Sequence, residues 1–349
     1  MAIDAALSPD EIRQHIADNP KKRARDLADQ LGVGEAALVA AQGATRIHAS
    51  PDAIMPGLKP VGEVMALTRN ISAVHEKTGI YDNYHSGDHA SMILTEEIDL
   101  RIFSRHWVHG FAVTTETERG PRHSLQVFDA AGDAIHKIYA REGTDMDAWR
   151  HLVSELTTGE VADHVALEPR VPAETPKADP EKADVLRKEW AAMTDTHQFM
   201  RLTSKLRMNR LGAYRIAGAP FATALAPCAL NDALEALAAQ DTQVMLFVGN
   251  KGCIQIHSGP VNTLRPMGPW QNIMDPGFNL HLRNDHVAEV WAIEKPTKRG
   301  PAISIEAFDK DGALILQMFG RRKESDKIDY TGAYKAIIDG LPTLETEEA

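Results

Sequence analysis

The chain is poor in cysteine and has no long apolar run. Among its 349 residues there are two cysteines, Cys228 and Cys253, which are too few and too far apart for a zinc ribbon or a disulfide framework. No stretch approaches the roughly 18 apolar residues of a membrane span. The first residues lack the basic and apolar parts of a secretory signal. We therefore expect a globular protein of the cytoplasm, without membrane insertion.

A net positive charge and the common nucleotide-binding motifs are also missing. The formal net charge of −11 repels polyanions, so we expect no nucleic-acid partner. Residues 23–31 and 35–42 form two predicted short helices around a glycine turn, as in a DNA-binding helix-turn-helix. The second helix has no lysine or arginine to contact bases, which favours a packing role and leaves a DNA-binding module as a weaker alternative. Phosphate loops, dinucleotide fingerprints and serine-nucleophile elbows are absent.

The pattern of predicted helices and strands indicates an α+β fold. Ser8 and Pro9 are typical of a helix start and predict a helix over residues 9–18. Alternating apolar segments predict strands at 62–70, 91–94, 99–103, 107–114, 124–128 and 134–139. Turn residues such as those at 131–133 connect several of these segments, which indicates an antiparallel sheet.

The chain contains an internal repeat. Residues 98–141 align with residues 278–321 at a constant shift of 180 positions, and thirteen of these 44 pairs are identical, whereas random pairing gives about three. The matches include an Arg-Gly-Pro at 119–121 and again at 299–301. We therefore predict a tandem duplication, in which each half opens with helices and continues with a large, mostly antiparallel sheet.

The predicted domain boundaries follow from this repeat. We expect an N-terminal repeat over residues 1–158, a linker over 159–184 and a C-terminal repeat over 185–349. The linker has prolines among its charged residues, which is typical of an extended segment. These prolines are Pro169, Pro172, Pro176 and Pro180. A crevice between two such repeats is a favourable place for a ligand.

The stretch 190–210 concentrates the candidate chemistry at one histidine, His197. Suitable N-cap residues stand just before it, so a helix should begin near His197. His197 stands two positions before Phe199, the first residue of the apolar stripe, and two positions correspond to about 200° of rotation around the helix axis. The N-cap candidates are Thr194, Asp195 and Thr196, and the stripe consists of Phe199, Leu202 and Leu206. His197 should therefore point away from the core, where it either binds a ligand or is a solvated helix-start residue.

The other histidines and the basic residues give weaker signals. No His-Glu-x-x-His motif or compact Cys/His set is present. His106 and His109 flank Trp107 in one predicted strand, and His106 aligns with His286 across the repeat, which indicates a structural role. Several basic residues near predicted strand ends or near His197 suit a ligand with two carboxylates, although they equally suit a solvated surface. They are Arg101, Arg207, Arg210, Lys295 and Lys298.

Several motifs together resemble a known family. They are Thr194-Asp195-Thr196-His197-Gln198-Phe199 with Asn209-Arg210, Ile98-Asp99-Leu100-Arg101-Ile102-Phe103 followed by His106-Trp107, Glu294-Lys295-Pro296-Thr297, and Gln317-Met318-Phe319-Gly320-Arg321. In this order, over nearly the whole chain, they resemble the bacterial haemin-degrading factor family of the HemS and ChuS type. The resemblance implies that haem b is bound non-covalently in a cleft between the two halves.

The resemblance also implies roles for individual residues. His197 matches the proximal axial ligand of the haem iron, and Arg101 matches the arginine on the distal face; both would take part in catalysis. Arg210 and Lys295 match positions that hold the haem propionates. The remaining matches are Gln317, a polar contact, and Phe103, Phe199 and Phe247, apolar walls. Ferric haem requires an imidazole, apolar faces and cations at its carboxylates, which these residue types supply.

At two positions, the sequence differs from what a direct transfer of the family's residue roles would require. His281 stands at the repeat partner of Arg101, so the halves have diverged and a second equivalent site around His281 need not exist. Phe319 stands where some family members have a tyrosine, so a phenol hydrogen bond in the pocket is lost.

Three functions are compatible with the sequence. As an enzyme, the protein would degrade haem oxidatively and release iron, with electrons from an external donor because no flavin or nicotinamide motif is present. As a carrier, it would receive haem from an inner-membrane importer and pass it on. As an interaction module, it would bind another protein, and His197 would be incidental. The resemblance favours haem trafficking with oxidative degradation.

Overall fold

The structure is a computed structural model that describes residues 7–160, 163–323 and 327–344. The first six residues, on which part of the expectation about a secretory signal rests, lie outside these ranges. Within the described ranges, no helix is long and apolar enough to cross a membrane. The chain divides into an N-terminal unit (residues 1–69, 76–171 and 249–255) and a C-terminal unit (residues 70–75, 172–248 and 256–349).

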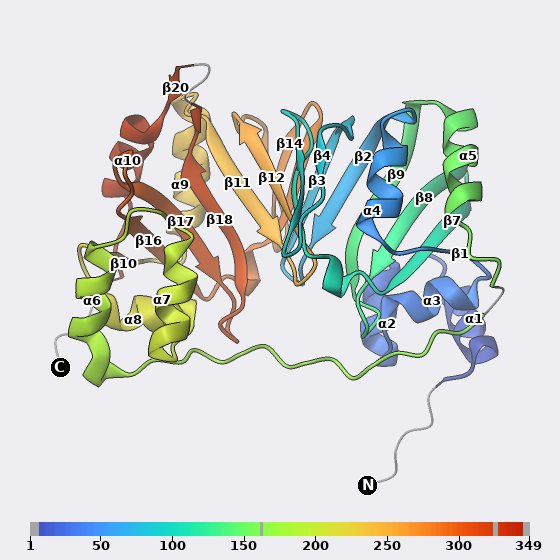
Figure 1. The fold of residues 1–349 in the computed structure, drawn as a ribbon, viewed down its shortest axis with the longest axis horizontal. Helices are drawn as coiled ribbons and strands as arrows, with labels where there is room; N and C mark the ends of the chain where they lie inside the picture. The colour runs from blue at the N-terminus through green and yellow to red at the C-terminus, as the bar shows by residue number, and fades with distance from the viewer. Residues whose placement is uncertain (1–6, 161–162, 324–326, 345–349) are drawn as a thin grey trace, which may run out of the picture. The chain divides into compact units, whose positions relative to one another are not determined.

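The N-terminal unit contains an antiparallel sheet with the strand order β1-β7-β8-β9-β2 (Figure 1). Its elements are α1 (Pro9–Asp18), α2 (Ala24–Leu31), α3 (Glu35–Ala41), β1 (Thr45–Ile47), α4 (Pro51–Leu58), β2 (Gly62–Arg69), β4 (Tyr84–His85), β5 (Ser91–Leu94), β6 (Asp99–Ile102), the 3-10 helix η1 (Ser104–His106), β7 (His109–Thr117), β8 (Gly120–Phe128), β9 (Ala134–Thr144) and α5 (Met146–Leu156). Helices α4 and α5 pack on one face of this sheet through a buried cluster that includes Ile54, Leu152 and Val64. Helix α3 packs on the other face through Ala36 and Phe111.

The C-terminal unit repeats this plan with the strand order β10-β16-β17-β18-β11. Its elements are the 3-10 helix η2 (Pro180–Lys182), α6 (Ala183–Ala191), α7 (Gln198–Leu206), α8 (Arg210–Ala217), β10 (Ala222–Leu225), α9 (Ala229–Ala239), β11 (Val244–Gly249), β13 (Leu264–Met267), β14 (Trp270–Asp275), β15 (Phe278–Arg283), the 3-10 helix η3 (Asn284–His286), β16 (Glu289–Lys295), β17 (Ala302–Phe308), β18 (Leu314–Gly320), β19 (Arg322–Lys323), β20 (Ile328–Asp329) and α10 (Thr331–Asp339). Helices α9 and α10 cover one sheet face through Leu234 and Ile337. Helices α6, α7 and α8 pack on the other through Trp190 and Tyr214.

Strands β3 (Ala73–Ile80) and β12 (Cys253–Gly259) contain residues of both units. The predicted α+β fold, used twice, is confirmed.

Repeated turns show the duplication at the level of single hydrogen bonds. The carboxylate of Asp129 accepts two backbone N–H groups in the turn before β9, and Asp309 does the same in the turn before β18. In the hairpins that contain the Arg-Gly-Pro repeat, the hydroxyl of Thr117 donates to the carbonyl of the glycine three residues on, and so does Thr297. The identities found across the repeat therefore mark residues that the turns require.

Asn70 and Asn250 are also equivalent in the repeat, but each belongs to the unit formed mainly by the other half of the chain. The side-chain amide of Asn70 donates to the carbonyl of Ile315 at 2.8 Å, and that of Asn250 donates to Ile135 at 2.9 Å. Each side-chain oxygen also accepts the backbone N–H groups two and three residues further on. Asn70 belongs to the C-terminal unit and Asn250 to the N-terminal unit. Each half of the sequence thus contributes a short segment to the other unit.

One predicted strand begins later than expected. The sequence pattern predicts a strand over 107–114, but β7 begins at His109, and His106 lies in η1. The reason is Trp107, whose ring is buried and whose indole N–H donates to the carbonyl of Gly252 at 2.9 Å. The prediction that His106 and His109 share a strand is therefore wrong. His286 ends η3 as His106 ends η1, so the two histidines occupy equivalent places.

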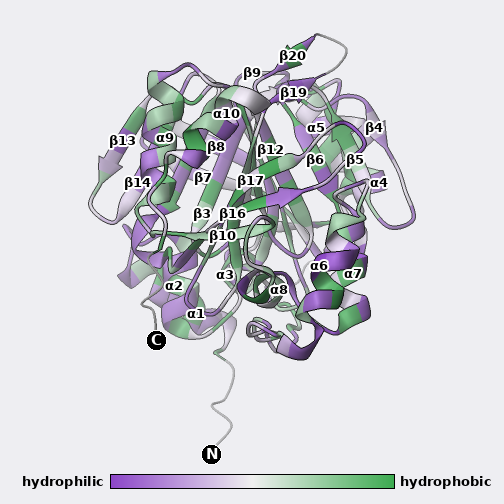
Figure 2. Ribbon diagram, turned by 90° about the vertical axis from the view of Figure 1, so that its left-hand side faces the viewer, coloured by the Kyte–Doolittle hydropathy of each residue, from purple (hydrophilic) through white to green (hydrophobic). Residues whose placement is uncertain are grey.

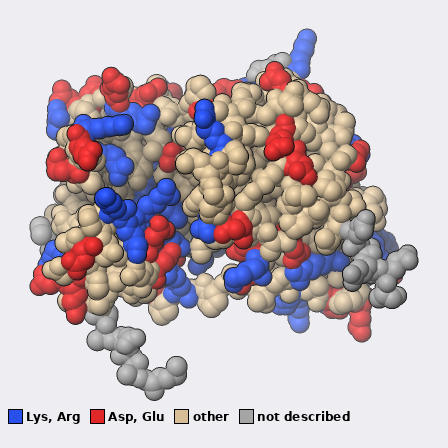
Figure 3. Space-filling view, turned by 180° about the vertical axis from the view of Figure 1, so that it is seen from behind, with Lys and Arg blue, Asp and Glu red and all other residues tan. Residues whose placement is uncertain are grey.

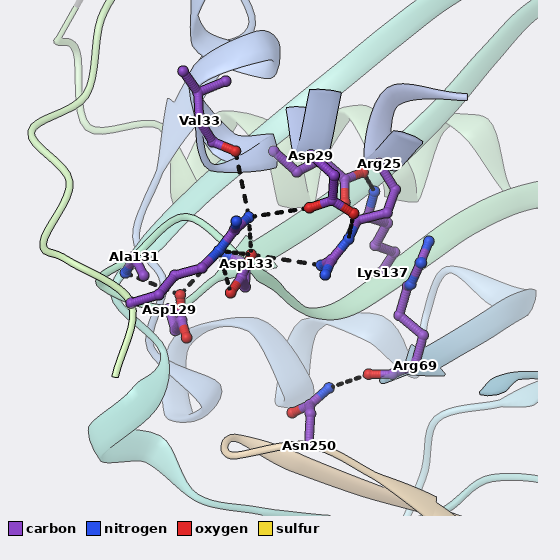
Figure 4. A network of polar contacts seen from close by, with 11 residues as sticks. Arg25, Asp29, Val33, Arg69, Asp129, Ala131, Asp133, Lys137 and Asn250 are labelled. Atoms are coloured by element: carbon purple, nitrogen blue, oxygen red, sulfur yellow. Dashed lines mark hydrogen bonds and ion pairs between the residues drawn. The ribbon is translucent and has the colours of Figure 1, made fainter. Parts of the chain in front are cut away.

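The linker has no helix or strand between residues 163 and 179, and its first part is bound to the N-terminal unit. The guanidinium of Arg170 donates to the carboxylate of Asp133 at 2.8 Å and to the carbonyl of Val33 at 3.3 Å. The same guanidinium donates to the carboxylate of Asp29 at 3.4 Å, and Figure 4 shows Val33, Asp29 and Asp133 close to one another. This part of the linker is thus held just before the start of α3.

The second part of the linker is bound to the C-terminal unit by one side chain, Asn209. The amide of Asn209 donates to the carbonyl of Thr175 at 2.8 Å, and its oxygen accepts the N–H of Lys177 at 3.0 Å. The same oxygen accepts the N–H of Gly212 and caps α8. Because Asn209 directly precedes Arg210, the linker fixes the helix start from which Arg210 extends.

A buried histidine in the N-terminal unit makes stability depend on pH. His136 is 1% exposed; its Nε2 lies 2.6 Å from the hydroxyl of Tyr81 and its Nδ1 lies 2.8 Å from that of Thr68. Burial lowers the pKa of His136 from 6.5 to about 3. Since the depressed pKa belongs to the folded state, the unfolded chain takes up a proton first as the pH falls below 6.5.

We predict that the free energy of unfolding of the wild type falls by about 1.4 kcal/mol per pH unit between pH 6.5 and 3 through His136 alone. His136→Gln should lack this component. Urea unfolding at several pH values measures it. His151→Gln, which changes a histidine whose side chain is 75% exposed, is the matched control. Equal pH slopes for the wild type and His136→Gln would contradict the prediction.

Candidate functional site

His197 stands at the N-cap of α7 with its imidazole in solvent. Its side chain is 95% exposed. The carboxylate of Asp195 accepts the backbone N–H of His197 at 2.8 Å, and the same oxygen lies 2.7 Å from the imidazole Nδ1. The predicted apolar stripe, Phe199, Leu202 and Leu206, is buried. The prediction that His197 points away from the packed stripe is therefore confirmed.

Phe199 packs inside the unit and holds α7 against the sheet. Its side chain is 1% exposed, and its ring centroid lies 4.5 Å from that of Trp190 and 5.5 Å from that of Tyr214. Lys295 Nζ lies 4.9 Å from the same centroid. Figure 2 shows α6 and α7 with alternating hydrophobic and hydrophilic bands, as expected for helices with one buried face. The resemblance assigns Phe199 to an apolar wall of the ligand site; its contacts in the structure are those of a residue that positions the helix of His197.

A buried carboxylate, Glu306, holds the basic residues next to α7. Its side chain on β17 is fully buried. One oxygen accepts from Lys295 Nζ at 2.9 Å, and the other accepts from Arg210 Nη1 and from the hydroxyl of Tyr214, each at 2.8 Å. Two cations therefore share one anion, which leaves one positive charge in excess. Glu306 is not among the residues predicted from the sequence; its signal is a single acidic residue within the mostly apolar strand 302–308.

Burial and mutual attraction set the protonation of this network. Burial lowers the pKa of Lys295 to about 8, although Glu306 opposes this shift. Burial alone would raise the pKa of Glu306, but Lys295 and Arg210 hold it below its usual range. Burial, reinforced by Glu306, raises the pKa of Tyr214. At neutral pH the carboxylate is therefore ionised and the lysine is mostly charged, so the excess positive charge persists.

Gln317 and Phe247 lie on the sheet face on which α7 and α8 pack. Gln317 on β18 is the cross-strand partner of Glu306 and of Phe247. Directly opposed residues of antiparallel strands point to the same face. Phe247 and Phe319 are half-buried, with ring centroids 5.4 Å apart. The predicted polar contact and one predicted apolar wall are thus brought together with the charge network.

Arg210 connects this network with the helix of His197. It is the first residue of α8, and its side chain is 24% exposed. Its Nη2 lies 3.7 Å from the sulfur of Met200, a residue 55% exposed that follows His197 by three positions in α7. The guanidinium is therefore accessible near the end of α7 that carries His197.

Arg101 and Phe103 lie in the N-terminal unit, whereas the six other predicted site residues lie in the C-terminal unit. Arg101 on β6 forms an ion pair with Asp99, and its guanidinium donates to the carbonyl of Leu100 at 3.0 Å. Burial raises the pKa of Asp99, although Arg101 opposes this. Phe103 is half-buried, and its backbone N–H donates to the carbonyl of Gly252 at 3.0 Å. Arg101 is thus held by neighbours in its own strand, and the backbone at Phe103 is held by a segment distant in the sequence.

Comparison with known proteins decides the family. The model of the haemin-degrading HemS.ChuX domain matches residues 32–156 and again residues 207–341. The chain belongs to this family. The hemin transport protein HemS of Yersinia enterocolitica is 40% identical over 321 residues, which cover 90% of this chain and 92% of that relative. The resemblance inferred from the sequence motifs is confirmed.

Solved structures of related proteins agree with the fold over nearly the whole chain. Holo-PhuS, a heme-binding protein from Pseudomonas aeruginosa, matches with a TM-score of 0.91 and 39% identity, covering 97% of this chain and all of that one. ChuS, described as an E. coli heme oxygenase, matches with a TM-score of 0.84 and 36% identity, covering 94% and 99%. The double match of the family domain also confirms the duplication.

The helices that open the two halves of the chain carry different chemistry at equivalent places. Arg23 is the N-cap of α2, whereas His197 is the N-cap of α7. At the start of the next helix, Glu35 pairs with Lys137 of the sheet, whereas Arg210 pairs with Glu306, so the charges are reversed. The candidate axial histidine therefore has no counterpart at this place in the N-terminal copy.

The N-terminal copy instead carries many basic side chains on one surface. Figure 3 shows Lys and Arg gathered on this unit. On its strands β8 and β9, Arg122 lies over the ring of Tyr139 at 5.4 Å and Arg141 is exposed. The C-terminal half thus has a histidine at a helix start together with a buried charge network. The corresponding sheet of the N-terminal half has exposed cations instead.

Proposed function

We propose that the protein binds haem b non-covalently, with His197 as the axial ligand of the iron. The observation that carries this proposal is the exposed imidazole at the N-cap of α7, whose Nδ1 is occupied by Asp195. Within the described part of the chain, no hydrogen bond involves the Nε2 of His197. That nitrogen can therefore donate its lone pair to iron. The relatives described as hemin transport and heme-binding proteins support the same ligand.

The charge network fits the carboxylates of haem. Arg210 and Lys295 share Glu306, so one positive charge is left to attract a propionate. Arg210 is the accessible member, whereas the side chain of Lys295 is 5% exposed. We propose that Arg210 contacts a propionate directly and that Lys295 contributes mainly through its charge. Phe247 and Gln317 would then contact the macrocycle from the sheet, as an aromatic surface and as a polar contact.

We propose that Arg101 and Phe103 act on the distal face, in the cleft that the sequence resemblance implies. Haem supplies the redox chemistry of its iron. The guanidinium of Arg101 would donate hydrogen bonds on the side opposite His197. Phe103, half-buried at the end of β6, would give that side an apolar wall.

In the cell, we propose that the protein carries haem and degrades it oxidatively to release iron. It would act in the cytoplasm, receive haem from an inner-membrane importer and take electrons from a separate donor. The relatives support both parts, because one is named a hemin transport protein and another a heme oxygenase. A carrier without catalytic activity is the second candidate, favoured by the solvent-exposed ligand, which suits haem exchange.

A hemin titration of the apo protein tests haem binding. We expect a sharp Soret band that saturates at one haem per chain. Hemin dimethyl ester should bind more weakly, because it brings no carboxylate to Arg210. Absence of a saturable band would reject the proposed function.

Degradation is tested on the loaded protein with ascorbate, O₂ and catalase. We expect Soret loss together with a linear tetrapyrrole and free iron, and a slower loss in Arg101→Ala. Catalase is needed because free peroxide bleaches haem without an enzyme. Intact haem under these conditions would favour the carrier.

A further inference from the structure

The segment before His197 is held in place by several hydrogen bonds. The N–H of Thr194 donates to the side chain of Gln198 at 2.9 Å, and Gln198 donates back to the hydroxyl of Thr194 at 3.2 Å. The backbone N–H of Lys298 donates to the carbonyl of Thr194 at 3.1 Å. Asp195 is therefore carried on a fixed backbone, and its carboxylate reaches both the N–H and the Nδ1 of His197.

The contact between Asp195 and Nδ1 determines which nitrogen of His197 carries the proton. A carboxylate only accepts hydrogen bonds, so at 2.7 Å the Nδ1 must be the donor. The lone pair of the neutral ring then lies on Nε2, which is the nitrogen that faces solvent. A carboxylate on the far nitrogen of a metal-bound histidine also makes that histidine a more basic ligand.

We propose that Asp195 is a positioning residue that holds His197 in the Nδ1-protonated form and lowers the reduction potential of the bound haem. This inference rests on the proposed axial role of His197. A more basic axial ligand stabilises ferric iron more than ferrous iron. Asp195 therefore makes the ferric complex tighter relative to the ferrous complex, so reduction of the haem loosens it.

Three substitutions separate this role from the hydrogen bond that the Asp195 carboxylate accepts from the backbone N–H of His197. Asp195→Asn keeps a side-chain oxygen that can accept from the backbone N–H and from the Nδ1 of His197, but it removes the charge. Asp195→Ser keeps a side-chain oxygen for the backbone N–H of His197 but is too short to reach Nδ1. Asp195→Glu restores the charge and serves as the rescue variant. Circular dichroism should be the same for all three, because Asp195 lies at the surface and the N-cap of α7 is His197, whose side chain makes no capping hydrogen bond.

The first measurement uses the apo protein and does not depend on haem. Nitrogen-15 NMR of the imidazole should show His197 with its proton on Nδ1 in the wild type and a mixture of both neutral forms in Asp195→Ser. The same mixture in the wild type would overturn the tautomer part of the proposal.

The second measurement is the midpoint potential of the bound haem. We expect the potential to rise by about 59 mV in Asp195→Asn, which corresponds to a tenfold fall in the ratio of ferric to ferrous affinity for a one-electron couple. Asp195→Glu should restore the lower value. Saturable hemin binding with an unchanged potential in Asp195→Asn and Asp195→Ser would overturn this inference and leave the proposed function intact. A wild type that binds no hemin would instead reject the proposed function.

Discussion

Replacement of His197 by glycine should weaken hemin binding by about 100-fold or more. Loss of a residue that only supports a metal ligand typically costs 10–100-fold in metal affinity, so loss of the ligand itself should cost at least the upper value. The structure predicts little effect on folding, because the side chain is 95% exposed and makes its contact with Asp195 alone among the described hydrogen bonds. The measurement is a hemin titration followed by Soret absorbance.

A rescue experiment makes this test specific. Imidazole added to His197→Gly should restore a sharp Soret band, since it fills the space of the missing ring. His164→Gly is the matched control, because His164 is 74% exposed and lies outside any helix or strand. A His197→Gly protein that titrates like the wild type would show that another residue ligates the iron.

Replacement of Glu306 by glutamine should lower the free energy of unfolding by about 3–5 kcal/mol, because it leaves Lys295 and Arg210 together without their anion in a buried site. Urea unfolding followed by tryptophan fluorescence measures the change. The matched control is Glu189→Gln, which removes the acidic partner of Lys205 in an exposed pair of the same unit. That loss should stay below about 1 kcal/mol.

The pH dependence checks the cause of this loss. The folded-state pKa of Glu306 lies below its usual range, so its stabilisation is present above the unfolded value of 4.5 and is lost as the pH falls further. The difference between the wild type and Glu306→Gln should therefore shrink below pH 4.5. A small and pH-independent difference would mean that the buried charges do not depend on Glu306.

The sequence predicted the elements whose ends are fixed by local side chains. Helix α1 has the predicted bounds because Ser8 and Glu11 cap its start reciprocally. Strand β5 also has its predicted bounds. By contrast, β3 and helices α4, α9 and α10 were not predicted. Helix α4 contains Pro56, which is unusual inside a helix, and its apolar residues pack against distant strands that no local pattern reveals.

The candidate site shows the same limit. His197 could be found because its helix start and its distance from the apolar stripe are both local features of the sequence. The partners of Lys295 could not, because Glu306 and Tyr214 reach it from another strand and from α8. The alternation of side chains along β16 shows on which face of the sheet Lys295 lies. It does not show which helices and strands cover that face. Hence the sequence leaves Lys295 either as a residue that holds a carboxylate ligand or as a solvated surface residue, whereas the structure shows its side chain buried.

Residues 70–75 and 249–255 each belong to the unit formed mainly by the other half of the chain. This exchange has a consequence for the origin of the protein. A fragment ending before the linker would lack residues 249–255, which complete its unit, and the remaining fragment would lack residues 70–75. Each fragment could recover an equivalent segment only from a second polypeptide, as in a domain-swapped dimer. An ancestral protein of half the length would thus have worked as a pair.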